Sequence, residues 1–353
     1  MLILVERVPY LMRRKYQRRL RKKDIVKHRI IFASIFFCLT FVLATGYSTF
    51  STNINLSAKG NVYKVSDKCY GTSDNGNGTV TITDYDKSCG TEVNIPSTIK
   101  GLTATKIGDN SFQNKGITKL TLPDTLVEVG NYAFHSNKLE SLTLPTNIKE
   151  VGKYAFEYNE IKYLKLNEGL KNIGLDAFNG NNLTEINIPS SVTYMEGGAF
   201  GNNNLKGDAA FIYGINSDGS TNYSVLNSYA GRNATGTSIP DTITVIQPEA
   251  YVNVKYEEIT IPGRIKEIPS YCFAYSMARK VTIEEGVETL NNMSLAGETI
   301  TSIDLPSTVK TIHQSTFKDN ENLTMINVNR KEGAIEGTPW GATNATLNWT
   351  GTN

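Results

Sequence analysis

The sequence is poor in the side chains that build catalytic and metal sites. Only three histidines and four cysteines occur among its 353 residues, and they are scattered along the chain. A zinc framework needs more of these ligands at closer spacing. The short sequence patterns of serine hydrolases, phosphate-binding loops and zinc proteases are missing as well. We therefore expect a protein that is not an enzyme and that uses no cofactor or metal.

The body of the protein also lacks an excess of positive charge. The formal net charge is +2, but residues 1–29 hold 11 Lys or Arg and only 2 Asp or Glu. The remainder is mildly acidic, with 25 basic and 32 acidic residues. Proteins that bind nucleic acids present a basic face to the phosphates. We therefore expect no nucleic-acid partner.

No apolar run in the chain is clearly long enough to be a membrane span. The longest uncharged run is Ile30–Thr45, which follows the basic segment 1–29 directly. Its length falls between the about 7–15 residues of a signal-peptide core and the about 17–25 residues of a spanning helix. Residues 30–46 are thus predicted to be either a cleaved signal or a retained transmembrane anchor. In both cases the basic end stays in the cytoplasm, and the chain from residue 47 onward lies outside, at the cell surface or secreted.

Two of the cysteines fit an exported protein. Cys69 and Cys89 bracket Asp74–Gly78, a turn signature between two extended runs. Outside the cell such a pair oxidises readily, and closing this loop contributes roughly 3 kcal/mol in the chain-entropy model. We predict a disulfide in an N-terminal cap over residues 61–95, preceded by a linker over residues 47–60. The alternative is two free thiols.

A repeat with a period of 22 runs through the rest of the chain. One series, mostly phenylalanine, keeps this step with a single gap of 51: Phe112, Phe134, Phe156, Phe178, Phe200, Tyr251, Phe273, Leu295 and Phe317. A second series keeps the same step, again with one gap, and proline follows most of its members: Leu122, Leu144, Leu166, Ile188, Ile239, Ile261, Ile283 and Leu305. Two phases of one period indicate a true structural repeat.

The pattern of one repeat predicts a short strand and a buried aromatic ring. Leu142 and Leu144 are two apart, so both point to the same side of a strand, and Pro145 ends it because proline donates no ladder hydrogen bond. A unit of this size cannot bury its apolar side chains alone, whereas stacked units share one core. We predict a β-rich solenoid of about ten turns with parallel strands over residues 91–330.

The repeat pattern resembles a known family. Leu-x-x-Leu-x-Leu-Pro-x-x-Leu-x-x-Val-Gly-x-x-Ala-Phe is similar to the BspA-type leucine-rich repeat of bacterial surface proteins, and the similarity covers about residues 61–350. It implies a leucine-rich-repeat fold and adhesion to host or neighbouring-cell proteins. Two turns depart from the pattern, at residues 230–251 and 274–295, where some of the leucine, proline and Ala-Phe positions are occupied by other residues.

Three other features of the repeat region carry structural predictions. Residues 205–229 fit no single turn and are predicted to be a hairpin whose aromatic residues either pack together or form a binding patch: Phe211, Tyr213, Tyr223 and Tyr229. Residues 331–353 contain both tryptophans, Trp340 and Trp349, and are predicted to cap the last turn. Cys272 takes an alanine position of the repeat and is predicted to be a buried hydrophobe.

A further series with the same step consists of asparagines. Asn137, Asn159, Asn181 and Asn203 occupy equivalent positions of successive turns. Stacked amides can satisfy backbone groups at a bend from turn to turn. We predict a structural ladder here rather than a ligand site.

The outward positions of the strands are the candidate binding site. On three successive turns these positions, called the candidate face below, are Ser141, Thr143, Tyr163, Lys165, Glu185 and Asn187. A regular core that presents varied side chains suits recognition, and Tyr163 has the character of an interface anchor. We predict an adhesin-like interaction module that binds a protein or glycan outside the cell, with membrane attachment only if residues 30–46 are uncleaved. The alternative is a passive envelope or matrix component with no specific ligand.

Overall fold

The protein divides into two units, which are described separately. A computed structural model describes residues 54–56, 62–64, 67–234 and 238–352. The units are Met1–Lys64 and Val65–Asn353. In the first, β1 (Ile54–Leu56) and β2 (Val62–Lys64) form an antiparallel pair. The predicted basic segment 1–29 and the apolar segment 30–46 lie outside the described residues.

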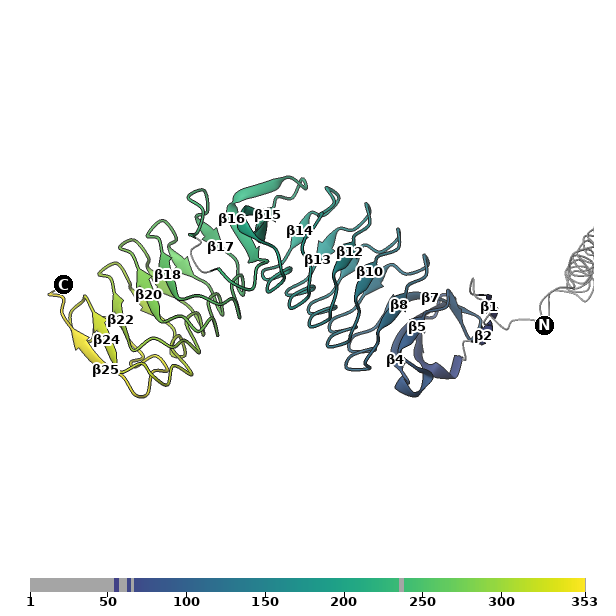
Figure 1. The fold of residues 1–353 in the computed structure, drawn as a ribbon, viewed down its shortest axis with the longest axis horizontal. Coiled ribbons are helices and arrows are strands. Elements are labelled where there is room, and N and C mark those ends of the chain that lie inside the picture. Colours follow the sequence, from purple (N-terminus) through teal and green to yellow (C-terminus); the bar gives the residue numbers. More distant parts are fainter. Residues whose placement is uncertain (1–53, 57–61, 65–66, 235–237, 353) are drawn as a thin grey trace, which may run out of the picture. The chain divides into compact units, whose positions relative to one another are not determined.

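No helix in the part of the chain that the structure describes is long and apolar enough to cross a bilayer. Its helices are three short 3-10 segments, namely η1 (Asp67–Cys69), η2 (Lys87–Cys89) and η3 (Gly207–Ala210). Strands and turns form the rest of the described ordered chain (Figure 1).

The second unit is a parallel-strand solenoid of about 12 turns, somewhat more than the ten predicted. Its turns follow one another in chain order (Figure 1). The first strand row contains β5 (Glu92–Asn94), β8 (Lys119–Thr121), β10 (Ser141–Thr143), β12 (Tyr163–Lys165), β18 (Glu258–Ile261), β20 (Lys280–Ile283), β22 (Ser302–Leu305), β24 (Met325–Val328) and β25 (Thr346–Trp349). Most of these are the strands that the leucine and proline pattern predicts.

A second strand row was not predicted. It contains β7 (Leu102–Ile107), β9 (Glu128–Val129), β11 (Glu150–Val151), β13 (Asn172–Ile173), β14 (Tyr194–Met195), β17 (Val245–Ile246), β19 (Glu267–Ile268), β21 (Thr289–Leu290) and β23 (Thr311–Ile312). Within it, β9, β11, β13 and β14 form one continuous parallel ladder. Most turns therefore have a strand in each of two rows rather than in one.

The sequence offset between paired strands equals the period of the repeat. Ser141 pairs with Tyr163 and Thr143 with Lys165, so the offset between paired residues is one full period of the sequence. Leu144 N donates to Lys165 O at 3.0 Å. This register aligns the leucines of successive turns on the inner side of the sheet, as the stacked-coil prediction requires. The fold class predicted from the sequence is confirmed.

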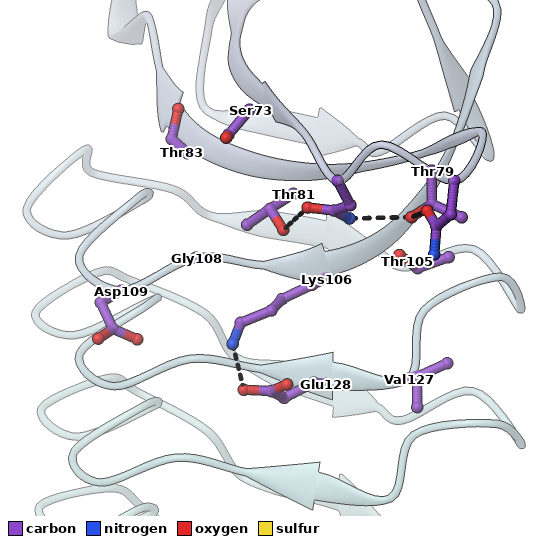
Figure 2. Close-up of a pocket in the computed structure, with 12 residues that line it drawn as sticks. Ser73, Thr79, Thr81, Thr83, Thr105, Lys106, Gly108, Asp109, Val127 and Glu128 are labelled. Atoms are coloured by element: carbon purple, nitrogen blue, oxygen red, sulfur yellow. Dashed lines mark hydrogen bonds and ion pairs between the residues drawn. The ribbon is translucent and has the colours of Figure 1, made fainter.

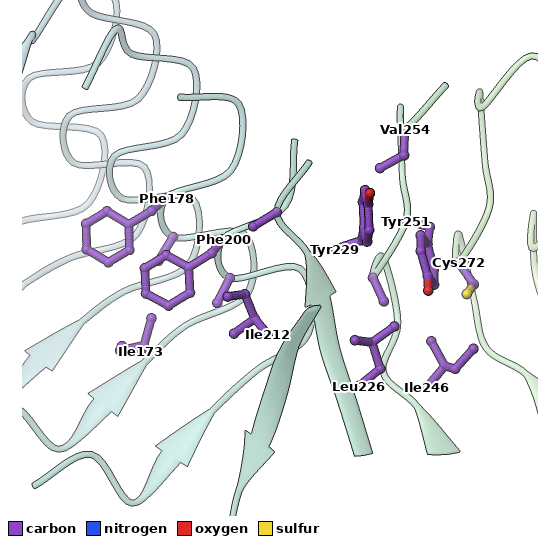
Figure 3. Packing of buried hydrophobic residues seen from close by; sticks show 14 of the residues in the cluster. Ile173, Phe178, Phe200, Ile212, Leu226, Tyr229, Ile246, Tyr251, Val254 and Cys272 are labelled. Atoms are coloured by element: carbon purple, nitrogen blue, oxygen red, sulfur yellow. The ribbon is translucent and has the colours of Figure 1, made fainter. Parts of the chain in front are cut away.

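A column of stacked aromatic rings forms the centre of the core. Phe134, Phe156 and Phe178 are fully buried, with ring centroids 5.2 Å and 5.6 Å apart and nearly parallel planes. Beyond Phe200 the column resumes at Tyr229, as Figure 3 shows. Such contacts add roughly 0.5–1.5 kcal/mol per pair to the stabilisation from burial.

The asparagine series is a structural ladder, as predicted. Asn137 accepts a hydrogen bond from Ile117 N (2.9 Å) and donates to Phe112 O (2.8 Å) and Phe134 O (2.9 Å). Asn159, Asn181 and Asn203 repeat these contacts with their own neighbours. The side chains are buried, so each amide satisfies backbone groups that have no access to water.

The first end of the solenoid carries an antiparallel hairpin. β3 (Tyr70–Asp74) and β4 (Thr79–Tyr85) pair with each other, and β4 pairs in parallel with β7, which also pairs with β6 (Thr98–Ile99). Cys69 and Cys89 form a disulfide at the base of this hairpin, with their Cα atoms 6.0 Å apart. The disulfide ties the two ends of the cap together.

The other end continues the repeat into the segment that was predicted to be a cap. β25 pairs in parallel with β24, so residues 346–349 add another strand to the first row. Trp340 is fully buried, and its carbonyl accepts a hydrogen bond from Phe317 N (2.9 Å) at the position of the next aromatic ring. Trp349 packs edge-on against it at 6.3 Å.

Candidate binding surfaces

The structure exposes every residue of the candidate face. β10 carries Ser141 and Thr143, and β12 carries Tyr163 and Lys165 in register beside them. Glu185 and Asn187 are exposed on the next turn, in a segment that forms no strand. The Tyr163 side chain is 73% exposed, which is far more than packing in a sheet requires.

Charged side chains at this surface pair with one another. Lys162 Nζ lies 3.3 Å from Glu140 Oε2, and Lys119 Nζ lies 4.0 Å from Glu92 Oε2. All four side chains are largely exposed, so each pair contributes little to stability. Lys165, within the candidate face, is exposed as well and can present its ammonium to a ligand.

A groove that the sequence did not predict lies between the cap hairpin and the second strand row. It has a volume of about 720 Å³. Most of its lining residues carry hydroxyl, amide or charged groups: Ser73, Asn75, Asn77, Thr79, Thr81, Thr83, Thr105, Lys106, Asp109 and Glu128. Gly108 and Val127 complete the lining, which Figure 2 shows. Its parts come from β3, β4, β7 and β9, so no single stretch of sequence shows it.

The polar groups of this groove are held in place by one another. Thr79 Oγ1 accepts from Asn75 Nδ2 (2.9 Å) and donates to Asn77 Oδ1 (2.6 Å). Lys106 Nζ forms an ion pair with Glu128 Oε1 at 2.6 Å (Figure 2). The hydroxyl, amide and charged groups of the groove thus fix one another's positions.

Glycines border the second strand row and form the floor of a smaller pocket of about 240 Å³. A Cβ at Gly152 would lie 2.7 Å from Asn131 N, so no side chain fits there. Lys153 Nζ pairs with Glu196 Oε2 (3.0 Å) beside this floor, and Tyr194 stands 55% exposed. The Val-Gly or Ile-Gly dipeptide found in several repeats was the sequence signal for this second surface.

The hairpin insertion consists of β15 (Phe211–Ile215) and β16 (Thr221–Tyr229), and its aromatic residues divide between packing and exposure. Phe211 and Tyr229 are buried, with ring centroids 5.2 Å apart. Tyr213 and Tyr223 contact each other edge-on at 5.0 Å, and Tyr223 is 61% exposed. Packing therefore accounts for the first pair, while Tyr223 remains accessible to a partner.

The two histidines and the free cysteine of the described residues lie in separate turns. His135 Nε2 contacts Glu157 Oε2 at 3.1 Å, whereas His313 contacts Ser315 on a distant turn. Cys272 is fully buried, and burial raises the pKa of its thiol well above the usual range. No group of three metal-ligating side chains occurs in the described ranges.

Comparison with known proteins supports the family resemblance. The profile of the BspA type leucine rich repeat region matches residues 84–206 and 226–338, in six copies. A comparison with curated proteins finds no match.

Three solved structures share the fold. A leucine rich cell surface protein from Faecalibacterium prausnitzii has a TM-score of 0.51 and 20% identity over 84% of this chain and 97% of its own. A leucine-rich repeat protein from Eubacterium ventriosum has a TM-score of 0.52 and 20% identity over 84% and 93%. The pneumococcal vaccine antigen PcpA has a TM-score of 0.54 and 15% identity over 80% and 86%. Similarity at these identities shows the fold alone.

Proposed function

Because the chain belongs to the family of BspA-type leucine-rich repeat proteins, we propose that it is a cell-surface interaction module that binds a protein or glycan partner. The surface location is supported by a structural relative that is described as a cell surface protein. An adhesin-like role follows if the partner belongs to a host or to a neighbouring cell. The proposal includes no catalytic step and no nucleic acid.

The exposed tyrosine of the candidate face carries this proposal. Tyr163 lies on β12 between Ser141 on the neighbouring strand and the exposed Glu185 of the next turn. A large aromatic side chain fixed on a strand loses little conformational freedom when a partner covers it, and such residues dominate interface energetics. The buried ring column and the asparagine ladder hold the strand beneath it, so the face is rigid.

Binding arrays with purified protein test this function. The chain is applied to protein and glycan arrays, and each hit is titrated to saturation. We expect Tyr163→Ala to weaken binding by more than about 1 kcal/mol and to leave the unfolding midpoint unchanged. Tyr194→Ala, a similarly exposed tyrosine on the second strand row, is the matched control and should bind normally.

The arrays also have outcomes that contradict the candidate face. If replacing all six residues of the face leaves binding intact, the ligand does not bind there. If Tyr194→Ala weakens binding as much as Tyr163→Ala, the second strand row or the whole surface is involved instead.

A passive envelope or matrix role is the alternative, and the self-paired surface charges favour it. Glu258 and Lys280 are within 3.5 Å on neighbouring strands, as are Glu140 and Lys162 at 3.3 Å. Exposed pairs of this kind contribute little to stability, and their charges are already balanced without a ligand. Saturable binding of any protein or glycan would exclude this alternative.

A further inference from the structure

Residues with a left-handed backbone conformation form a column along one edge of the solenoid. Two members of this column, one before and one after the hairpin insertion, are acidic. At one equivalent position of six turns φ lies between +51° and +67°, namely at Tyr132, Tyr154, Asp176, Gly198, Glu249 and Tyr271. Tyr132 and Tyr154 stack on each other at 4.6 Å. Around the insertion, the aromatic side chains give way to an aspartate, a glycine and a glutamate.

The turn formed by the end of β16 is one residue short at this edge. Asn227 O accepts a hydrogen bond from Gly198 N (3.0 Å), and Tyr229 N donates to Ala250 O (2.7 Å). Only Ser228 therefore lies between Asn227, whose carbonyl accepts, and Tyr229, which carries the aromatic ring. The neighbouring turns have two residues between the equivalent positions. The turn of β16 therefore contributes no left-handed residue to the column.

The short turn brings two carboxyl groups together. Gly198 has no side chain, and a Cβ there would overlap Asp176 Oδ1 and lie 3.3 Å from Glu249 Cβ. Asp176 and Glu249, from turns on opposite sides of the insertion, both lie against this glycine, and their side chains interact with each other. We call these two residues the acid pair.

The surroundings of the acid pair give no positive charge to balance it among the groups that the structure describes. Asp176 is 2% exposed, and Asn179 Nδ2 donates to its Oδ1 at 2.9 Å. The charged groups whose field reaches Asp176 are Glu249 and Glu157, both acidic. Three tyrosine rings complete the surroundings: Tyr132, Tyr154 and Tyr158. The imidazole of His135 contacts Glu157 and not the pair itself.

We propose that Asp176 and Glu249 share one proton, and that this proton closes the junction between the turns before and after the hairpin insertion. Asp176 is buried and Glu249 is half-buried. Two ionised carboxylates so close to each other repel, whereas one proton between them makes a short O–H···O⁻ hydrogen bond. Asn179 donates to Oδ1 of Asp176, the oxygen that also lies against Gly198.

The direction of the titration agrees with this arrangement. Burial raises the pKa of Asp176 well above its usual range, and the hydrogen bond and charge of Glu249 raise it further. A carboxyl group with a raised pKa in the folded state stabilises that state at low pH, and the stabilisation is lost as the pH rises. The junction should therefore loosen on the alkaline side, where the pair loses its proton.

The acid pair adjoins the hydrogen bonds that join the short turn to the turns before it, since Gly198 takes part in one of them. Asn227 Nδ2 donates to Glu196 O (2.7 Å) and Gly198 N donates to Asn227 O (3.0 Å) across the junction. These contacts join the end of β16 to the turns that precede it. The acid pair is thus a pH-dependent latch for the hairpin that carries the exposed Tyr223.

The test combines a titration with hydrogen exchange on the full chain. In ¹³C NMR of the aspartate carboxyl groups, Asp176 should stay protonated well above the pH at which an aspartate in a model peptide ionises. Amide exchange of residues 226–230, corrected for the intrinsic pH effect, should accelerate about tenfold or more between pH 6 and 9, since one pKa unit corresponds to a factor of ten.

Two variants and a control make the exchange experiment decisive. Asp176→Asn and Glu249→Gln each replace one carboxyl by a neutral amide that bonds the other at every pH, so the acceleration should vanish in both. Glu168→Gln, at an exposed acid of the same stretch of turns, should keep it. If Asp176→Asn fails to fold, Glu249→Gln and the wild-type titration decide.

Three results would overturn the proposal. The first is an ordinary titration of Asp176 in the wild-type chain. The second is an unchanged acceleration in Glu249→Gln. The third is restoration of protection at pH 9 by millimolar Ca²⁺ in the wild type only, which would show that the pair holds a cation rather than a proton.

Discussion

At the residue scale, one buried ring per turn does most to hold the stack. Phe156 is fully buried, and its ring lies between those of Phe134 and Phe178. The sequence identified these residues because a step of 22 repeats without drift over five turns. It could not identify Tyr229 as the next ring, because the insertion changes the spacing there.

Truncating one ring of the column tests this packing. Phe156→Ala removes contacts on both faces of the ring and leaves a cavity, so we expect the free energy of unfolding to fall by about 3–5 kcal/mol. Chemical denaturation measures it. Tyr163→Ala, an exposed ring close by in the sequence, should change stability by less than about 0.5 kcal/mol. Equal effects of the two substitutions would show that Phe156 is not a core residue.

A second residue-scale prediction concerns a glutamate that interrupts the asparagine ladder. Glu298 is 3% exposed and accepts hydrogen bonds from Ser276 Oγ (2.6 Å) and Ala278 N (2.6 Å). Burial raises its pKa from 4.5 to about 7. The folded state therefore favours the protonated form, and stability falls as the pH rises from about 4.5 to about 7 and is level above that.

Glu298→Gln should remove this part of the pH dependence, because the amide keeps an acceptor and does not ionise. Between pH 4.5 and 8 the wild type should lose on the order of 3 kcal/mol more stability than the variant. Denaturant unfolding at several pH values measures the difference. Other carboxyl groups with a raised pKa, such as Glu157, contribute equally in both proteins, so their effect cancels in the difference. If the free energy of unfolding depended on pH in the same way in both proteins, a raised pKa of Glu298 would be contradicted.

At the element scale, the two strand rows differ in how far the sequence predicts them. The strands of the first row follow a Leu-x-Leu-Pro pattern, whose alternation is visible in the sequence. β9, β11 and β13 have two residues each, too few for alternation to be recognised. The groove between β4 and β9 was missed for a related reason: it joins segments whose pairing no local pattern shows.

At the same scale, a disulfide cross-links the elements of the N-terminal cap. Cys69 and Cys89 lie 20 residues apart and join η1 to η2 at the base of the β3–β4 hairpin. Reducing agent should lower the stability of this cap by roughly 3 kcal/mol in the chain-entropy model. The double variant Cys69→Ala/Cys89→Ala should be insensitive to reductant. Peptide mapping without reduction that finds both thiols free would contradict the bridge.

At the scale of the whole molecule, the fold followed from the sequence and the binding behaviour did not. Repetition predicts a solenoid because each turn needs its neighbours for burial. Alternation decides which side chains of a strand face outward, and the six residues of the candidate face are indeed exposed, although binding there stays a prediction. The acid pair was beyond prediction: it depends on a single missing residue beside Ser228, where the sequence shows only a gap of irregular length.

A stack of this kind should transmit packing energy only between neighbouring turns. Phe134 and Phe156 are in ring contact at 5.2 Å, whereas Phe317 belongs to a turn several repeats further along the chain. In double-mutant cycles to alanine, the Phe134–Phe156 pair should show a coupling of roughly 0.5–1.5 kcal/mol. The Phe134–Phe317 pair should be additive within about 0.5 kcal/mol. Denaturant unfolding of the single and double variants measures both couplings, provided that each variant unfolds in one transition. A distant coupling as large as the local one would mean that the solenoid responds as one block, because nearest-neighbour contacts alone cannot carry energy across intervening turns.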